Sequence, residues 1–528
     1  MRSRVLESIL LALVVACAGY TVYSTSFYRP LFQNGDNCGY LILGKALATG
    51  RGFANLSIPT HPQGLWWPPG FPVFVALFHV IAGGRWGMLK VLIFAMLYGS
   101  IFLFGHLVYR REESLTDSLV ISTLLCLSSS IHLLSSYLYS ETFFIVVSLT
   151  FFCVWERVRQ RMSPTKLVGL SVWAVYVAAV RNVGMSLPLA LVAYYGLVPP
   201  RRRAPGSRWY ALIPLCLLGG YICIVTCLPA VRVGSILHFF GIHPYLDSGA
   251  ASAGGAPGRV VASKLSGIIH TLRGYGLTLV PQSLFRSLYN SMTMNMAKAM
   301  MCAGVSLMVV WGWIVTVRTC LLANLYTLLF MAILFAYGPF YLRLVVPIVP
   351  FFILYFYFGT RSAVFSGLRN KAVASAAFGI VCMVLLADNA RQTYTNPRRT
   401  MPPRFGDRHY QRCIEWVNEN VPREDLVVSE ISLYMYLHRG GYTIPYHYTD
   451  VPQVHLDFLD DWGAKYLMTS PFSMRSRLTY MNALRRAMEE YPHLFKIVFD
   501  GGDGRSQVVE YTPGSGVGEE RPTRQEHL

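Results

Sequence analysis

The fold class is set by stretches such as residues 86–109, WGMLKVLIFAMLYGSIFLFGHLVY, which are followed directly by Arg110 and Arg111. A run of roughly 20 mostly apolar residues is long enough to cross a bilayer as a helix. A basic pair just after such a run is typical of a cytoplasmic loop. Because this pattern recurs along the chain, we predict a polytopic α-helical membrane protein.

The composition supports this class. Of the 528 residues, 53% are hydrophobic and only 14% are charged, whereas soluble domains carry roughly 25% charged residues. These values exclude a water-soluble enzyme and a disordered chain. The formal net charge is +19, but the basic residues form short clusters between apolar runs. We therefore interpret the basic clusters as a signal that orients the chain in the membrane, and we expect no nucleic-acid partner.

The apolar runs predict about eleven transmembrane helices. They are residues 5–23, 86–109, 117–135, 138–155, 167–180, 184–198, 209–231, 300–317, 321–337, 344–358 and 372–390. With Arg2 and Arg4 in the cytoplasm, every second connecting loop contains Lys or Arg. This alternation predicts that the C-terminal tail lies outside the cytoplasm.

The predicted organisation is a transmembrane module in residues 1–390, with outward loops 24–85 and 232–295. Residues 391–512 form a small extracytoplasmic α/β domain with a hairpin at the sequence GGDG of 501–504. Residues 513–528 form a disordered tail. Within the first loop, 71–81 and 35–49 are predicted to be helices in the membrane interface.

Acidic residues are rare in the membrane half, so each one is informative. Asp36 and Glu141 lie at the same predicted outer membrane surface, where one carboxylate can act as a base and the other can orient a substrate or a metal ion. The structural alternatives are a turn or N-cap role for Asp36 and a helix-dipole role for Glu141. The residues alone leave both alternatives open.

Two arginines lie outside the cytoplasmic loops in which the positive-inside rule concentrates Lys and Arg. Arg181 and Arg343 fall at predicted outer helix ends, and a guanidinium group binds phosphate oxygens in a bidentate manner. The alternative is that they extend toward lipid head groups. In the first loop, Lys45, Arg51 and His61 are further candidates. Trp67 either stacks on a sugar or anchors the chain at the interface.

Several motifs follow one another in a recognisable order. They are Asp36-x3-Tyr40, GKALATGRGF at 44–53, WPPGFP at 67–72, YSE at 139–141, RNVG at 181–184, YLRLVVP at 341–347, LVVS at 426–429 and GAKY at 463–466. Together they resemble the GT-C membrane glycosyltransferases, in particular the bacterial PMT-like branch related to protein O-mannosyltransferases and lipid A aminoarabinose transferases. The resemblance covers residues 1–512. Trp67 stands where the aminoarabinose transferases carry a phosphate-binding Lys before Pro-Pro.

The resemblance implies an inverting transferase that moves a hexose or pentose from a polyprenyl-phosphate donor to a glycan, lipid or protein acceptor. Asp36 would be the catalytic base and Glu141 would support the acceptor. If a divalent ion such as Mg²⁺ or Mn²⁺ takes part, these two carboxylates are its implied ligands. The remaining implied substrate- or lipid-phosphate-binding residues are Arg343, Arg181, Lys45, Tyr40, His61 and Trp67.

The implied location is a bacterial inner membrane, in contact with membrane lipids, with the C-terminal domain outside the cytoplasm. The alternative function is a multipass transporter or a lipid-linked sugar flippase. Such proteins place charged residues near the membrane midplane. This chain instead has its unusual charges at one predicted surface, together with long outward loops, and these features favour the transferase.

Overall fold

The computed structural model describes residues 2–26, 35–64, 67–135, 137–197, 207–227, 279–285, 296–337, 342–395, 408–447, 451–469 and 479–513. Its contacts divide the chain into two compact units. Unit 1 comprises Met1–Leu31 and Leu65–Arg399, and unit 2 comprises Phe32–Gly64 and Thr400–Leu528. Each unit is described separately below.

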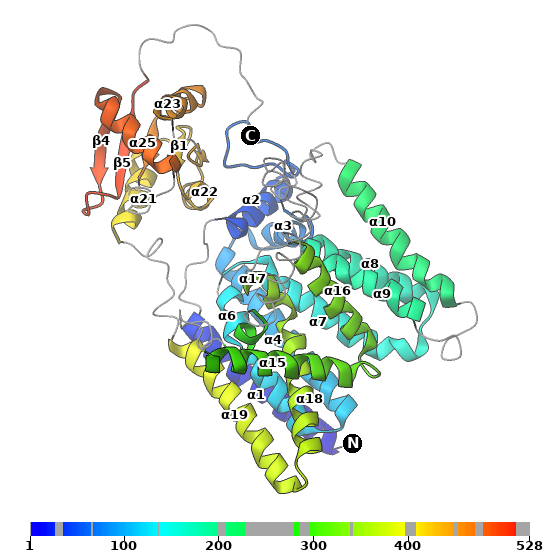
Figure 1. Ribbon diagram of the computed structural model, residues 1–528. Helices are drawn as coiled ribbons and strands as arrows, with labels where there is room; N and C mark the ends of the chain where they lie inside the picture. The colour runs from blue at the N-terminus through cyan, green and yellow to red at the C-terminus, as the bar shows by residue number, and fades with distance from the viewer. Residues whose placement is uncertain are drawn as a thin grey trace, which may run out of the picture. The chain divides into compact units, whose positions relative to one another are not determined.

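Unit 1 is helical throughout its described residues (Figure 1). Its α-helices are α1 (Arg2–Ser26), α3 (Gly70–Ala82), α4 (Trp86–Glu112), α5 (Leu115–Leu127), α6 (Ser129–Ser135), α7 (Ser140–Val158), α8 (Pro164–Val180), α9 (Ser186–Leu197), α10 (Leu212–Cys227), α14 (Val280–Leu284), α15 (Met296–Thr316), α16 (Leu321–Tyr337), α17 (Leu342–Val345), α18 (Val349–Gly367) and α19 (Lys371–Thr395). Short 3₁₀ turns are η1 (Arg159–Arg161), η2 (Asn182–Met185), η4 (Ser207–Ala211) and η7 (Val346–Ile348).

Several of these helices have the properties of membrane spans. Among the described residues, 6 helices are long and apolar enough to cross a bilayer: Val5–Ser24, Trp86–Glu112, Leu115–His132, Met296–Thr316, Leu342–Gly367 and Lys371–Gln392. Large apolar side chains such as Leu6, Leu13, Ile380 and Met383 are exposed on the outer faces of these helices. Lipid tails, unlike water, solvate such faces without cost. The chain is therefore a multi-pass membrane protein.

Each of the other five predicted spans also coincides with a helix. In chain order these helices are α7, α8, α9, α10 and α16. Four of these are shorter apolar helices in the described part of the chain. The fifth, α7, carries the charged residues Glu141, Glu156 and Arg157. The count of eleven spans stays a prediction.

The predicted single span 117–135 consists of two helices, α5 and α6, which are separated at Ser128. The backbone N–H of Ser129 donates to Asn389 Oδ1 of α19 at 3.1 Å. Asn389 Nδ2 donates in turn to the carbonyl oxygen of Leu284 at 2.8 Å. A buried amide side chain thus satisfies one backbone N–H at the break and one carbonyl at the end of α14.

Helices α15 and α18 cross at two glycines. A Cβ atom on Gly312 would lie 1.7 Å from the carbonyl oxygen of Tyr355, and one on Gly359 would lie 2.0 Å from that of Met308. Only glycine fits at either position. Small residues that let two backbones touch are a common basis of helix association in membranes.

Unit 2 is a small α/β unit, as predicted for the tail (Figure 1). Its elements are α2 (Asp36–Ala48), α21 (Arg408–Asn420), β1 (Val427–Ser429), α22 (Ser432–Arg439), β2 (Thr443–Ile444), α23 (Pro452–Asp461), β3 (Tyr466–Met468), α25 (Thr479–Glu490), η9 (Pro492–Leu494), β4 (Phe495–Asp500) and β5 (Gln507–Tyr511). The strand order is β2-β1-β3-β5-β4. Strand β1 is parallel to β2 and β3, while β5 is antiparallel to β3 and β4. The predicted hairpin at 501–504 joins β4 to β5.

The first-loop residues fold with the tail. Ile42 and Ala46 of α2 pack against Tyr436 of α22, and Ile58 enters the core beside the sheet. The N–H of Thr443 donates to the carbonyl oxygen of Ser57 at 2.8 Å. The division therefore differs from the sequence-based one, which assigned all of 24–85 to the membrane module and began the tail at 391. Helix α2, predicted for the membrane interface, packs Ile42 and Ala46 against Tyr436 within unit 2.

Candidate functional site

Three charged residues predicted from the sequence meet in unit 1. Glu141 lies in the first turn of α7. Arg181, which follows α8, places its Nη1 atom 2.7 Å from Glu141 Oε1. Arg343 of α17 contacts the same carboxylate oxygen through its Nε atom. The sequence singled out each residue separately, and the structure brings them together.

The exposed fractions and charges of this cluster indicate its chemistry. The Glu141 side chain is 0% exposed, while Arg181 is 13% and Arg343 is 30% exposed. A buried carboxylate is tolerated only when it is paired. Here two guanidinium groups share one carboxylate oxygen. Partly exposed guanidinium groups held in this way suit an anionic ligand.

Further contacts hold both arginines in place. Arg181 Nη1 also donates to Ser140 Oγ at 2.9 Å. The Arg343 guanidinium carbon lies 4.4 Å from the centroid of the Tyr139 ring, a cation–π contact. The buried Nε atom of Arg181 has no acceptor among the described residues. An unsatisfied buried donor is costly, so an incoming oxyanion would be stabilised there.

Two glycines of the predicted motifs shape the surroundings of Arg181. A Cβ atom on Gly184, in η2, would lie 2.4 Å from the carbonyl oxygen of Val177. A Cβ atom on Gly70, at the start of α3, would lie 2.7 Å from the backbone nitrogen of Val180. Tyr176 also donates its hydroxyl hydrogen to the Gly70 carbonyl at 3.2 Å. These contacts fix the backbone where α8 ends and Arg181 begins.

The surroundings of Glu141 do not fit a divalent metal ion. Its Oε1 atom already faces two cations, and a third positive charge there would be repelled. Within the described part of the chain, no group of at least three His, Cys, Asp or Glu side chains is arranged to hold a metal. The residues present favour an anion site, and no metal ion is needed to explain the position of Glu141.

The other predicted site residues are distributed between the units. Asp36 is the first residue of α2, after the N-cap residue Gly35, and Tyr40 is buried one turn later. Lys45 and His61 also belong to unit 2. Trp67 belongs to unit 1 and is partly buried, three residues before Gly70. A shared site of Asp36 with Glu141 stays a prediction, because the two residues lie in different units.

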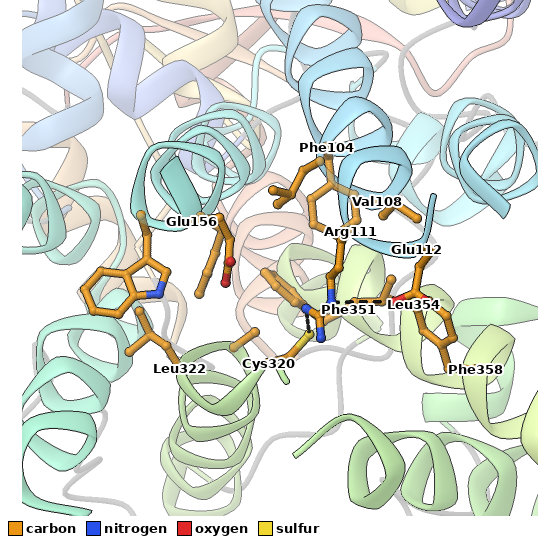
Figure 2. A pocket seen from close by; sticks show the side chains of 14 residues that line it. Phe104, Val108, Arg111, Glu112, Glu156, Cys320, Leu322, Phe351, Leu354 and Phe358 are labelled. Carbon is orange, nitrogen blue, oxygen red and sulfur yellow. Dashed lines mark hydrogen bonds and ion pairs between the residues drawn. The ribbon is translucent and has the colours of Figure 1, made fainter. Parts of the chain in front are cut away.

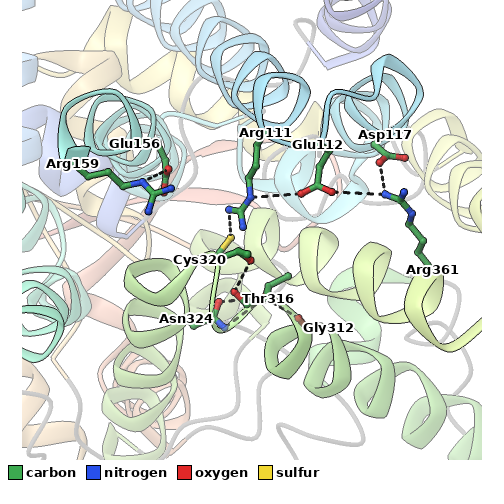
Figure 3. A network of polar contacts seen from close by, with 11 residues as sticks. Arg111, Glu112, Asp117, Glu156, Arg159, Gly312, Thr316, Cys320, Asn324 and Arg361 are labelled. Atoms are coloured by element: carbon green, nitrogen blue, oxygen red, sulfur yellow. Dashed lines mark hydrogen bonds and ion pairs between the residues drawn. The ribbon is translucent and has the colours of Figure 1, made fainter. Parts of the chain in front are cut away.

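A second ionic network in unit 1 was missed by the sequence analysis (Figure 3). Asp117 accepts a hydrogen bond from the Tyr357 hydroxyl at 2.6 Å and pairs with Arg361. Arg361 also lies 3.9 Å from Glu112. Asp117 is an acidic residue at the start of the apolar run 117–135, and this feature of the sequence could have indicated the network. These residues adjoin loops that the sequence orients toward the cytoplasm, so we interpret the network as structural.

A small cavity adjoins this network (Figure 2). Its volume is about 40 Å³, and aromatic and aliphatic side chains such as Phe104, Phe351 and Leu354 line it together with Arg111 and Glu156. A space of this size holds only one or two water molecules. It is therefore too small for a sugar or a lipid phosphate.

The comparisons with known proteins identify the fold. The sequence matches no protein-family model and no curated protein. Archaeoglobus fulgidus oligosaccharyltransferase AglB, in complex with an inhibitory peptide and a dolichol-phosphate, has a TM-score of 0.57 at 10% identity, over 98% of this chain and 75% of AglB. The same protein tethered with an acceptor peptide has a TM-score of 0.57 at 10% identity, over 96% of this chain and 74% of that one.

A second neighbour is similar over its whole length. ArnT from Cupriavidus metallidurans in the apo state has a TM-score of 0.56 at 13% identity, over 96% of this chain and 98% of ArnT. The chain therefore shares its fold with the oligosaccharyltransferase AglB and with ArnT.

Proposed function

We propose that the protein is a glycosyltransferase that moves a sugar from a polyprenyl-phosphate donor to an acceptor on the outer side of the membrane. The observation that carries the proposal is the cluster of Glu141, Arg181 and Arg343, whose two partly exposed guanidinium groups suit a phosphate group. A structural neighbour of the same fold was solved with a dolichol-phosphate and an inhibitory peptide. The bond that breaks would be the one between the sugar and the lipid phosphate.

In this proposal the arginines bind the leaving group. Negative charge grows on the phosphate as its oxygen separates from the anomeric carbon, and fixed cations stabilise that charge. Arg343, the more exposed of the two, contacts the phosphate oxygens, and the free Nε donor of Arg181 adds a second contact. Glu141 is a positioning residue, because it holds both guanidinium groups.

Asp36 is the proposed catalytic base. It takes the proton of the acceptor hydroxyl while the hydroxyl oxygen attacks the anomeric carbon, and the polyprenyl phosphate leaves in the same step. A single displacement of this kind inverts the anomeric configuration. Tyr40 and Trp67 are proposed contacts for the sugar and the acceptor.

The lipid-binding part is tested with the full chain in nanodiscs and undecaprenyl phosphate as the probe. We expect Arg343→Gln and Arg181→Gln each to weaken binding by about tenfold or more, since each loses a charge-assisted hydrogen bond. The control is Arg369→Gln, which alters an exposed arginine between α18 and α19. Equal binding by all three variants and the unmodified chain would overturn the phosphate site.

The catalytic part is tested with Asp36→Asn and a panel of undecaprenyl-phosphate sugars. We expect transfer to fall by about 10²–10⁴-fold, the range for loss of a general base, while undecaprenyl phosphate binding stays unchanged. Undiminished transfer by this variant would exclude Asp36 as the base. Absence of transfer by the unmodified chain with every donor would favour the transporter or flippase.

A further inference from the structure

A second cavity, formed entirely by unit 2, has a volume of about 390 Å³. Three basic side chains, Lys45, Arg51 and Arg423, line it together with His61, and Glu424 is the acidic residue among its lining side chains. The formal charge of the lining is therefore positive. In the described part of unit 2, none of the three cations forms an ion pair with a carboxylate.

The cations lie close enough to affect one another. Burial, followed by the charges of Arg423 and Arg51, lowers the pKa of Lys45 below its ordinary value. Burial and the charge of Arg51 likewise lower the pKa of His61. Neighbouring positive groups repel one another, and a bound anion reduces that repulsion.

The backbone holds these side chains in a fixed arrangement. The turn after α2 uses Gly50 and Gly52 in the left-handed region, at φ +73° and +66°, and Arg51 lies between them. Gln63 Nε2 donates to the carbonyl oxygen of Arg51 at 3.0 Å. On the other wall, the N–H of Tyr442 donates to the carbonyl oxygen of Arg423 at 3.2 Å. Such preorganisation lowers the cost of binding.

Two tyrosines add surface for the carbon part of a ligand. Lys45 Nζ lies 5.2 Å from the centroid of the Tyr436 ring, and the His61 ring lies 5.9 Å from that of Tyr442. The cavity therefore combines cations with aromatic faces. Oxyanions and the polar headgroups that carry them match both features.

We propose that this cavity is a binding site for a phosphate group carried by a small polar headgroup, with Lys45, Arg51 and Arg423 as its ligands. The site consists of unit 2 residues alone and does not rest on glycosyl transfer. The phosphate can come from a soluble sugar phosphate or from a lipid headgroup, and the experiment below separates these sources.

The test measures how fast an amine-reactive reagent modifies Lys45 in the full chain, read by mass spectrometry. In phosphate-free maltoside detergent micelles, inorganic phosphate should slow modification of Lys45, compared with chloride at the same ionic strength. Lys496, whose side chain is 77% exposed on β4, is the internal control and should be unaffected. Equal slowing at both lysines, or slowing at neither, would overturn the proposal.

Charge-removing variants identify the ligands. Arg51→Gln and Arg423→Gln should each raise the phosphate concentration for half-protection by about tenfold, the loss of one charge-assisted contact. Both side chains are exposed, so the fold should be retained. Arg505→Gln, in the exposed β4–β5 hairpin, should leave protection unchanged. Unchanged protection in both cavity variants would contradict the assignment.

The two sources differ in one further measurement. In nanodiscs containing phosphatidylglycerol, protection of Lys45 without added phosphate would identify a lipid headgroup as the occupant. Protection that still requires added phosphate would identify a soluble phosphate compound. Either result agrees with the phosphate site, which remains testable even if Asp36→Asn leaves sugar transfer intact.

Discussion

At the residue scale, the central feature is a single buried carboxylate that holds two arginines. Glu141→Gln keeps the shape of the side chain but removes its charge, so that two neighbouring guanidinium groups lose the carboxylate that they share. Breaking a buried ion pair in this way costs about 3–5 kcal/mol. We expect a clear fall in the thermal unfolding temperature of the detergent-solubilised protein, measured by intrinsic fluorescence.

The matched control is Glu112→Gln, because that side chain is 28% exposed and its ion pairs are longer. A small or absent change is expected for this variant. Adding Arg181→Gln to Glu141→Gln should recover part of the lost stability, since one of the two repelling charges is gone. Equal unfolding temperatures for Glu141→Gln and Glu112→Gln would contradict the anchoring role.

The residues of this cluster were predictable individually, and their arrangement was not. Glu141, Arg181 and Arg343 stand out because charged side chains are rare in apolar surroundings. The resemblance suggested that Glu141 supports the acceptor or holds a metal. The contact between Arg343 and Glu141 joins positions far apart in the chain, and no local periodicity reports such a pairing. Arg423, across the cavity from Lys45, was missed for the same reason.

At the scale of elements, the crossing of α15 and α18 depends on the absence of two Cβ atoms. Gly312→Ala would place a methyl group 1.7 Å from the carbonyl oxygen of Tyr355. This overlap is relieved only if the two helices move apart. Overpacking of this kind costs about 1–3 kcal/mol or more. We expect a lower unfolding temperature.

The same helix provides the control for this prediction. A Cβ atom on Gly304, also in α15, would meet nothing within 4 Å. Gly304→Ala should therefore leave stability unchanged or raise it, since alanine favours a helix over glycine by about 1 kcal/mol. A loss of stability in Gly304→Ala as large as in Gly312→Ala would show that the crossing is not the cause.

The helix positions could be predicted from the apolar runs, since a membrane span needs little more than length and hydropathy. The break between α5 and α6 could not be predicted from the sequence. It depends on Asn389, an amide in a helix near the end of the membrane part, and on the backbone of Leu284. In an apolar medium, tertiary hydrogen bonds of this kind decide where a helix can be interrupted.

At the scale of the whole molecule, the division into units predicts that first-loop residues stabilise the tail. Ile58 is 8% exposed in the core of unit 2. Ile58→Ala should cost about 2–5 kcal/mol through the cavity that it leaves. We expect faster hydrogen exchange in β1 and β2. Ile497→Ala, at a position 53% exposed on β4, should leave exchange in these strands unchanged.

The predicted orientation is a second property of the whole chain. Basic loops in alternate connections predict a C-terminus outside the cytoplasm. A phosphatase fused after Leu528 should therefore be active in intact bacterial cells, and a fluorescent protein fused there should remain dark. Fluorescence with an inactive phosphatase would reverse the predicted topology.

The sheet of unit 2 was expected from short alternating patterns in the tail. The inclusion of residues 36–64 was not, because membrane helices separate them from that sheet in the sequence. Local patterns describe which segments are apolar, but they do not specify which distant partner will cover them.

Unit 2 is formed by two segments that are far apart in the sequence, so one of them is synthesised long before the other. Ser57 leaves the ribosome long before Thr443, whose amide it will bind. At roughly 5–20 residues per second, the wait is on the order of tens of seconds. During this time the apolar face of α2, with Ile42 and Ala46, has no α22 to cover it. Maturation of the protein therefore requires that this face be shielded until the last part of the chain arrives.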